Sequence, residues 1–417
     1  MVKAPVATPV LPPYEALPYA PLAHAHTHPA RLAAIARAAG VAAAPAETAR
    51  VLELGCAAGW NLIPMAARLP RARFFGIDLD PAAIAHGQVA AAELGIDNLQ
   101  LAAGDIMELG HRLGADTPWG TRGGFDYIIV HGVYSWTPEH VRRRTLELFA
   151  ELLAPDGVGF LSFNALPGWA SRGMIADTMK RFTAGIDDPL DRVNAALGLL
   201  TALTAAAPED DTGWQRRLSL EVAFLRGTPP SYLFHDHLSP DNVAFWVSDV
   251  IADLGRHGLD WIGDADPSLH RRLTPEALAS IRNLAPDRTA AEHLLDMAGY
   301  RTFRRLLLTR AGKALVPVPD DLDPRLPAPA TAPSSDLARP EVCRVVRAQL
   351  ARGHERLVSL RHEAVAMRST TRAVAVLADG TRTRGDLCAL VPGVDDALAD
   401  LRRLDLLVPG VPREAAA

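Results

Sequence analysis

The sequence predicts an α/β protein in which a mostly parallel sheet is covered by helices on both faces. From residue 49 to residue 164, short apolar segments alternate with helical segments, and this alternation is typical of a doubly wound sheet. In addition, glycine or acidic residues follow the apolar segments at residues 55, 78 and 105. Open α/β sheets bind their ligands at the carboxyl ends of the strands, so we expect a binding site there.

The expected strands and helices follow each other in regular order. The strands are residues 49–55, 72–80, 99–105, 125–132 and 157–164, and the helices are residues 29–44, 59–69, 81–95 and 138–153. Residues 172–225 and 240–257 also have helical character. Two later segments, 258–267 and 300–310, have the composition of strands and are expected to close the same sheet.

These elements suggest a division of the chain into segments. We expect an N-terminal arm and helix (1–44), a ligand-binding core (45–171) and a helical insertion (172–257). These are followed by the last strands of the core sheet (258–312), a proline-rich linker (313–336) and a small winged-helix-like C-terminal domain (337–417). In the C-terminal domain, a helix at 340–352 and a hairpin turn at Ala378-Asp379-Gly380-Thr381 are expected.

Composition narrows the class of protein. The chain has 417 residues and a formal net charge of −5, whereas nucleic-acid-binding domains usually carry a basic excess. It has no apolar stretch of about 18 residues that would predict a membrane span. The three cysteines, Cys56, Cys343 and Cys388, lack metal-ligand spacing. We therefore expect a cytoplasmic protein without a metal, a secretory signal, or nucleic-acid or membrane partners; its oligomeric state stays open.

The first candidate binding segment is the turn at residues 51–59, VLELGCAAG. Its small residues allow a ligand to approach the backbone closely, and the following helix should offer unpaired amides. A dinucleotide fingerprint would need glycine where Ala57 stands, so we expect no pyrophosphate here. The candidate ligand-binding residues are Glu53, Gly55, Cys56, Ala57, Gly59 and Asn61.

Two acidic residues follow the next two strands. The carboxylate of Asp78, next to Leu79, can accept hydrogen bonds from two neighbouring ribose hydroxyls. Asp105, followed by Ile106, occupies the corresponding place after the third strand. Either acid can instead cap the helix after it. Asp80 precedes Pro81 and suits capping better than Asp78 does, so we expect the two aspartates to divide these roles.

The loops after the fourth and fifth strands are the candidates for the chemical step. They contain His131, Tyr134 and Trp136, and then Asn164 and Trp169. We take the first four as candidate catalytic residues and His131 also as a candidate cofactor contact. The alternative for each is structural: a histidine satisfied by its neighbours, aromatic side chains in the core, or an asparagine in a turn.

Several strings resemble one bacterial enzyme family. VLELGCAAGWNLIPMA, GIDLDPAAIAHGQ, FDYIIVHGVYSW and the N-x-x-PGW pattern are similar to class I (Rossmann-like) methyltransferases that use S-adenosylmethionine (SAM) and carry a methyltransferase regulatory domain. SYLFHDHLSPDNVAFW (231–246) and GLDWIGDAD (258–266) resemble that regulatory domain, and ADGTRTRGDL (378–387) resembles the C-terminal domain. The resemblance covers nearly the whole chain. At Trp60, the chain departs from the glycine that is common in the family.

The resemblance implies a cofactor and a role for each motif. SAM would be the cofactor and S-adenosylhomocysteine the product. The Glu53–Gly59 turn would wrap the amino-acid part of SAM, Asp78 would bind the ribose, and Asp105 and Ile106 would contact the adenine.

The resemblance also implies an acceptor. The family includes rickettsial protein lysine methyltransferases, which makes a lysine of a protein or peptide the expected acceptor. A small-molecule O- or N-methyltransferase is the alternative, followed by a SAM-binding scaffold. The expected acceptor pocket contains Tyr14, Tyr19, Tyr134, Trp136 and Trp169, with the amine proton passing to water, Tyr134 or His131. We expect residues 1–28 and the 172–257 helices to serve the acceptor rather than the cofactor.

Overall fold

The computed structural model describes Leu17 and residues 21–112, 119, 123–208, 213–270, 273–326 and 339–408. These residues form two compact units. One consists of Gly168–Val243 together with Leu17, and the other consists of Pro21–Pro167 together with the chain from Ala244 onward. The second unit contains the sheet and the C-terminal domain.

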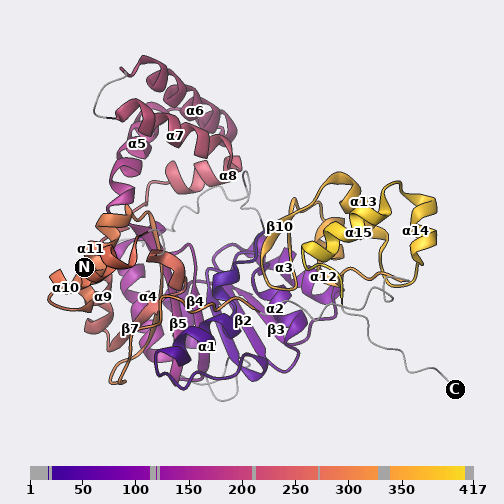
Figure 1. Cartoon of the computed structure of the whole chain (residues 1–417), viewed down its shortest axis with the longest axis horizontal. Helices are drawn as coiled ribbons and strands as arrows, with labels where there is room; N and C mark the ends of the chain where they lie inside the picture. Colours follow the sequence, from indigo (N-terminus) through magenta and orange to yellow (C-terminus); the bar gives the residue numbers. More distant parts are fainter. Residues whose placement is uncertain are drawn as a thin grey trace, which may run out of the picture. The chain divides into compact units, whose positions relative to one another are not determined.

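The central sheet has the predicted parallel arrangement over its first five strands (Figure 1). Its order is β3-β2-β1-β4-β5-β8-β7, and β6 pairs with the end of β5. The strands are β1 (Arg50–Leu54), β2 (Arg73–Asp78), β3 (Leu99–Ala103), β4 (Phe125–Val130), β5 (Leu153–Ala165), β6 (Ala244–Phe245), β7 (Leu259–Asp264) and β8 (Phe303–Arg310). Only β8 runs antiparallel to its neighbours β5 and β7. The two late segments therefore close the sheet, as their composition predicts.

Helices cover the sheet, and their ends follow local sequence signals. They are α1 (Pro29–Ala38), α2 (Leu62–Arg68), α3 (Pro81–Glu93), α4 (Glu139–Leu152), α9 (Val247–Arg256), α10 (Pro275–Leu284) and α11 (Arg288–Gly299). The Asp80 carboxylate caps α3 by accepting from the amides of Ala82 and Ala83 at 2.8 and 3.1 Å. The predicted 29–44 helix ends early, at Ala38, because Gly40 adopts a left-handed φ of 92°. No helix in the described ranges has the length and apolar character needed to cross a membrane.

The helical unit contains α5 (Gly168–Phe182), α6 (Pro189–Ala206), α7 (Trp214–Arg226), α8 (Pro230–Tyr232) and a π-helical turn at Leu233–His237. Its core is apolar and includes Met179, Val193, Leu200 and Leu218. This unit ends at Val243 rather than near residue 257, because Val250 and Leu254 of α9 belong to the core of the sheet.

The C-terminal domain, drawn in yellow in Figure 1, is built from helices and one hairpin. Its elements are α12 (Arg344–Ala351), β9 (Arg356–Val358), β10 (Ala364–Ala366), α13 (Ser369–Leu377), α14 (Arg384–Leu390) and α15 (Val394–Arg403). The prediction of a hairpin around Asp379-Gly380 is wrong: residues 369–377 are helical, and the hairpin is β9–β10. The apolar side chains before Asp379 also fit helical spacing, and Gly380 at φ 82° lies in the turn that follows α13.

The C-terminal domain shares an apolar core with the helices beside the sheet. Ile63 of α2 and Ala90 and Leu94 of the α3 end belong to the same buried cluster as Val345 and Leu357. A polar contact lies at the same junction, where the Arg68 guanidinium donates to the carbonyl oxygen of Ser359 at 2.7 Å. The domain is therefore packed against the core of its unit.

A buried ion cluster fixes β8 against α11. The guanidinium of Arg304 is fully buried and lies 2.7 Å from a carboxylate oxygen of Glu292, 2.8 Å from one of Asp296 and 3.5 Å from one of Asp264. Burial lowers the pKa of Arg304, but the three carboxylates outweigh burial and raise it overall. The carboxylates thus need this cation to remain ionised inside the protein.

Arg304→Met should therefore destabilise the protein by about 3–5 kcal/mol, because it leaves buried carboxylates without a cation. Chemical denaturation measures this free energy of unfolding. Arg282→Met is the matched control, since Arg282 and its partner Asp320 are both nearly half exposed, and an exposed pair contributes at most about 1 kcal/mol. Equal losses in the two variants would contradict this account of the cluster.

Candidate functional site

The predicted site residues follow the carboxyl ends of β1 to β4, which meet at one edge of the sheet. Leu54 of β1 pairs with Ile77 of β2, and Asp78 pairs with Ala103 of β3. The amide of Gly104 also donates to the carbonyl oxygen of Asp78 at 2.8 Å. This register brings the turn after β1 and the acids after β2 and β3 together.

The turn after β1 needs its small residues. Gly55, Ala57 and Gly59 have φ angles of 76°, 47° and 71°, in the left-handed region that favours glycine. A Cβ atom on Gly55 would lie 2.5 Å from Cγ2 of Val133, in the loop after β4. The backbone thus passes close to the loop where the chemical step is expected.

Four amides of this turn are used within the chain. Those of Gly55 and Cys56 donate to the carbonyl of Ile77, and that of Gly59 donates to the carbonyl of Cys56. The amide of Ala57 donates to Asp78 at 2.7 Å. Burial raises the pKa of the Cys56 thiol, which keeps it neutral. These four amides are therefore already paired, and the side chains around the turn are the next candidates for polar recognition.

Glu53 is a buried carboxylate whose surroundings favour a cationic ligand. Its side chain is only 3% exposed. One carboxylate oxygen, Oε1, accepts from Nδ2 of Asn61 at 2.9 Å, while the buried Oε2 has no hydrogen-bond partner among the described residues. Burial raises the pKa of Glu53 to about 8, and the nearby Asp78 adds to the shift. An ammonium group at Oε2 would satisfy this oxygen and stabilise the carboxylate.

Asp78 is arranged to accept further hydrogen bonds. Its Oδ2 accepts from the Ala57 amide at 2.7 Å and its Oδ1 from the Asp80 amide at 3.0 Å. The Leu79 amide also donates a hydrogen bond to this carboxylate. A carboxylate has about four acceptor positions, so capacity remains for a ribose hydroxyl. Burial raises the pKa of Asp78. Because Asp80 caps α3, the predicted division of roles between the two aspartates fits the geometry.

Asp105 follows the third strand, and apolar residues lie next to it in the sequence. Oδ1 of Asp105 accepts from the Met107 amide at 2.9 Å, which is the capping interaction weighed above. The neighbouring Ile106 is buried in the core, whereas Leu79 is 48% exposed after β2. An exposed apolar side chain next to Asp78 suits the flat face of a nucleoside.

His131 is held as a neutral stacking residue. Its ring lies on that of His24 with centroids 3.9 Å apart, and Phe160 stacks at 5.9 Å. Burial, together with the positive charge of Arg305 and the neighbouring His24, lowers the pKa of His131 well below its usual value. The lowered pKa disfavours the protonated form of His131, which favours the structural alternative for this residue.

Tyr134 and Asn164 lie inside the structure. The Tyr134 ring packs in the core against Phe245 and Phe163, and burial raises its pKa to about 12. Asn164 is buried in the sheet, where it pairs with Ala244 and Phe303. These positions favour the structural alternatives for Tyr134 and Asn164 over a role in the chemical step. Trp136, in contrast, is half-buried.

Of the other expected acceptor residues, the structure describes Trp169 alone. Trp169 belongs to the core of the helical unit, where it is buried and contacts the ring of His237 at 5.4 Å. Tyr14 and Tyr19 lie outside the described residues.

Sequence reasoning missed the partners of Asn61. The His24 amide and the Thr27 hydroxyl contact this side chain from the N-terminal segment, and His362 does so from the C-terminal domain. His24 and Thr27 therefore contact the cofactor turn, the segment Glu53–Asn61 that follows β1. This differs from the expectation that residues 1–28 serve the acceptor rather than the cofactor. Trp60 points toward the C-terminal domain, where its ring lies 4.6 Å from that of His354.

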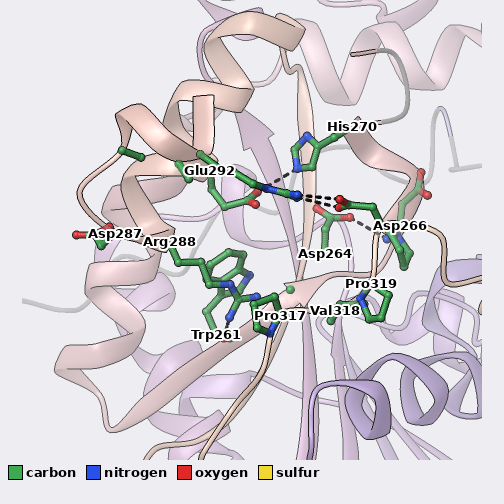
Figure 2. Close-up of a pocket in the computed structure, with 16 residues that line it drawn as sticks. Trp261, Asp264, Asp266, His270, Asp287, Arg288, Glu292, Pro317, Val318 and Pro319 are labelled. Carbon is green, nitrogen blue, oxygen red and sulfur yellow. Dashed lines mark hydrogen bonds and ion pairs between the residues drawn. The ribbon is translucent and has the colours of Figure 1, made fainter. Parts of the chain in front are cut away.

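A separate pocket lies between β7, the α10–α11 pair and residues 317–320 (Figure 2). Arg288 lies over the ring of Trp261 at 3.8 Å, and His270 contacts Glu292 at 3.3 Å. The predicted cofactor residues do not line it. Its charged groups pair with one another, which favours a structural role. Among the described residues, no cluster of histidine, cysteine and acids is arranged to hold a metal ion.

The residues at the strand ends fit SAM. The unpartnered Oε2 of Glu53 suits the ammonium group of its amino-acid part. The glycines of the turn let its backbone pass close to Val133 and Leu101, and Asp78 retains acceptor capacity for the ribose.

Three family models match separate parts of the chain. One described as a methyltransferase domain matches residues 52–158. One described as a predicted methyltransferase regulatory domain matches residues 229–310, and one described as the C-terminal winged helix domain of PKMT matches residues 338–393.

Two uncharacterized proteins of Rickettsia prowazekii (strain Madrid E) are similar in sequence. RP789 is 30% identical over 297 residues, which cover 71% of this chain and 52% of RP789. RP028 is 30% identical over 238 residues, which cover 57% of this chain and 92% of RP028. The chain thus spans about half the length of the first relative and nearly all of the second.

The fold is similar to the solved structure of PKMT2 from Rickettsia typhi in complex with AdoHcy. The TM-score is 0.79 at 19% sequence identity, and the match covers 94% of this chain and 100% of that chain.

Ligand binding should release a proton from Glu53. At pH 7 its carboxyl is mostly protonated, because its pKa is about 8, and an ammonium at Oε2 favours the ionised form. The affinity for S-adenosylhomocysteine should thus rise between about pH 6 and pH 7.5. Calorimetry in buffers of different ionisation enthalpy should detect the released proton.

The Glu53→Gln variant isolates this effect. It should bind more weakly and lose the part of the pH dependence that comes from the protein, leaving only the titration of the ligand's own amino group. Wild-type binding with no proton release, or an unchanged pH profile in the variant, would show that Glu53 does not meet the ammonium.

Proposed function

We propose that this chain, which belongs to the class I SAM-dependent methyltransferases with a methyltransferase regulatory domain, methylates lysine side-chain amines of a protein. The observation that carries the choice of acceptor is the C-terminal domain. Residues 338–393 match the model of the PKMT winged helix domain, and this domain packs on the helices beside the cofactor turn. The likeness of the whole fold to PKMT2 supports the same choice.

The protein contributes position and electrostatics to the reaction. When bound, SAM supplies an electrophilic methyl group on a sulfonium, and transfer is an in-line displacement that depends on alignment. Glu53 and Asp78 hold the two ends of the cofactor site and so fix where a methyl group would emerge, beside the loop after β4. No metal is required for this step.

The acceptor amine must be neutral before it attacks. A free lysine ammonium has a pKa of about 10.4, and an apolar surrounding lowers that pKa by disfavouring the charge. Because the pKa of Tyr134 is raised to about 12 and that of His131 is strongly lowered, neither is suited to take the proton at neutral pH. We therefore assign the proton to water.

Trp136 is the aromatic residue in this loop that remains available to the acceptor. It lies in the 3₁₀ turn Tyr134–Trp136 after β4 and is half-buried. Its backbone is fixed, because the Trp136 amide donates to the carbonyl of Val133 at 3.0 Å, and Val133 touches the cofactor turn at Gly55. We propose that its ring forms an apolar wall for the lysine chain.

Trp136→Ala should lower the methylation rate by at least about tenfold, by losing the wall that positions and desolvates the amine. Its affinity for S-adenosylhomocysteine should stay near that of the wild type. Tyr134→Phe is the matched aromatic control from the same turn, and it should change turnover by less than tenfold because the ring packs in the core. A larger loss in Tyr134→Phe than in Trp136→Ala would overturn these assignments.

The acceptor itself is tested by incubating the protein with labelled SAM and host lysate, followed by mass spectrometry. We expect label on lysine nitrogen of one or a few proteins, at a rate that rises with pH because only the neutral amine attacks. Label on oxygen, or on a free metabolite, would contradict the lysine proposal and favour a small-molecule methyltransferase.

A further inference from the structure

One buried side chain joins three distant segments of the chain. Asn61, 4% exposed, lies just before α2. It contacts Glu53 from the cofactor turn, His24 and Thr27 from the N-terminal segment, and His362 from the C-terminal domain. Of these, His362 is 301 positions away in the sequence.

The hydrogen bonds of Asn61 determine which way its amide faces. Oδ1 accepts from the His24 amide at 2.9 Å and lies 3.1 Å from Nε2 of His362. Nδ2 donates to Glu53 at 2.9 Å and to the Thr27 hydroxyl at 3.0 Å. The hydroxyl is free to accept, because it donates to the His24 carbonyl at 2.8 Å. All four positions of the amide are then used, and a flipped amide would direct its oxygen at Glu53.

The position of His362 is set by the hairpin of the C-terminal domain. It lies between β9 and β10, is fully buried, and has a left-handed φ of 59°. The Ser359 amide donates to the Glu363 carbonyl at 2.8 Å, which closes this turn. Burial, with His28 and Arg68 nearby, lowers the pKa of His362 well below its usual value. The ring is therefore neutral, and a neutral ring that faces Oδ1 through Nε2 carries its proton there.

We propose that His362 is a positioning residue for the cofactor: its hydrogen bond to Asn61 holds the amide so that Nδ2 engages Oε1 of Glu53 and Oε2 stays open for the ammonium of SAM. This inference rests on the proposed function, since it needs SAM as the ligand. It makes the C-terminal domain a part of the cofactor site, in addition to any role toward a substrate.

His362→Phe tests the proposal, because it keeps a ring of similar size and removes the donor. The full-length variant should bind S-adenosylhomocysteine at least about fivefold more weakly by calorimetry, because Oδ1 of Asn61 keeps the His24 amide but loses one of the hydrogen bonds that orient the amide toward Glu53. In steady state, KM for SAM should rise more than kcat falls. His362→Gln, whose amide can donate toward Asn61, should recover part of the affinity.

His354→Phe is the matched control. His354 belongs to the same domain and also packs on the helix side of the turn, against Trp60, but it has no hydrogen bond to Asn61 among the described contacts. The affinity of the His354→Phe variant for S-adenosylhomocysteine should be within about twofold of that of the wild type. Thermal unfolding without ligand shows whether any loss of affinity follows a general loss of stability.

The results separate two claims, the binding of SAM at this site and the positioning role of His362. Normal binding by the wild type and by His362→Phe would overturn the positioning role and leave the cofactor assignment intact. Equal losses of affinity and stability in His362→Phe and His354→Phe would also overturn it, in favour of simple domain packing. A wild type that does not bind S-adenosylhomocysteine would overturn both the cofactor assignment and the positioning role.

Discussion

A buried amide with all its hydrogen bonds made cannot rotate without leaving donors and acceptors unpaired. Asn61 is such a group, and the cofactor side of the site depends on it. Because its partners come from the N-terminal segment, the turn after β1 and the hairpin of the C-terminal domain, the orientation of the Glu53 carboxylate depends on how all three are packed. The apolar core shared by α2, α3 and the C-terminal domain keeps His362 in reach.

The candidate site contains two buried acids, and SAM carries an ammonium group and ribose hydroxyls that would complement them. Glu53 and Asp78 are both withdrawn from water, and burial raises the pKa of each. Such carboxyls are costly to ionise alone and become favourable beside a cation or several donors. The same chain treats its other buried acids differently, since Asp296 and Glu292 have Arg304 as a permanent partner. The unpartnered oxygen on Glu53 thus supports the proposal that this carboxylate meets a ligand.

Much of this arrangement could be predicted from sequence, because it depends on local signals. The strand-end positions of Glu53, Asp78 and Asp105 follow from the alternation of strands and helices. The cap at Asp80 follows from the proline after it. The burial of Tyr134 and Asn164 could not be predicted in this way. Tyr134 follows β4 and packs against Phe245 of β6, and Asn164 lies within β5, where it pairs with β6 and β8 from far along the chain.

The contact between His362 and Asn61 had no signal in the sequence, because neither spacing nor composition connects positions so far apart. The hairpin that presents His362 was itself misplaced by the Asp379-Gly380 turn signal, which belongs instead to the connection between α13 and α14. Local turn chemistry was visible there, while the three-residue strands β9 and β10 were too short to stand out.

The most direct test of the account is a crystal structure of the full-length protein with S-adenosylhomocysteine. The ligand's amino nitrogen should lie within about 3.2 Å of Oε2 of Glu53, with the ribose hydroxyls on Asp78 and with Asn61 still bonded to His362. A ligand whose amino group is bound by other residues, or an Asn61 amide turned away from Glu53, would contradict it.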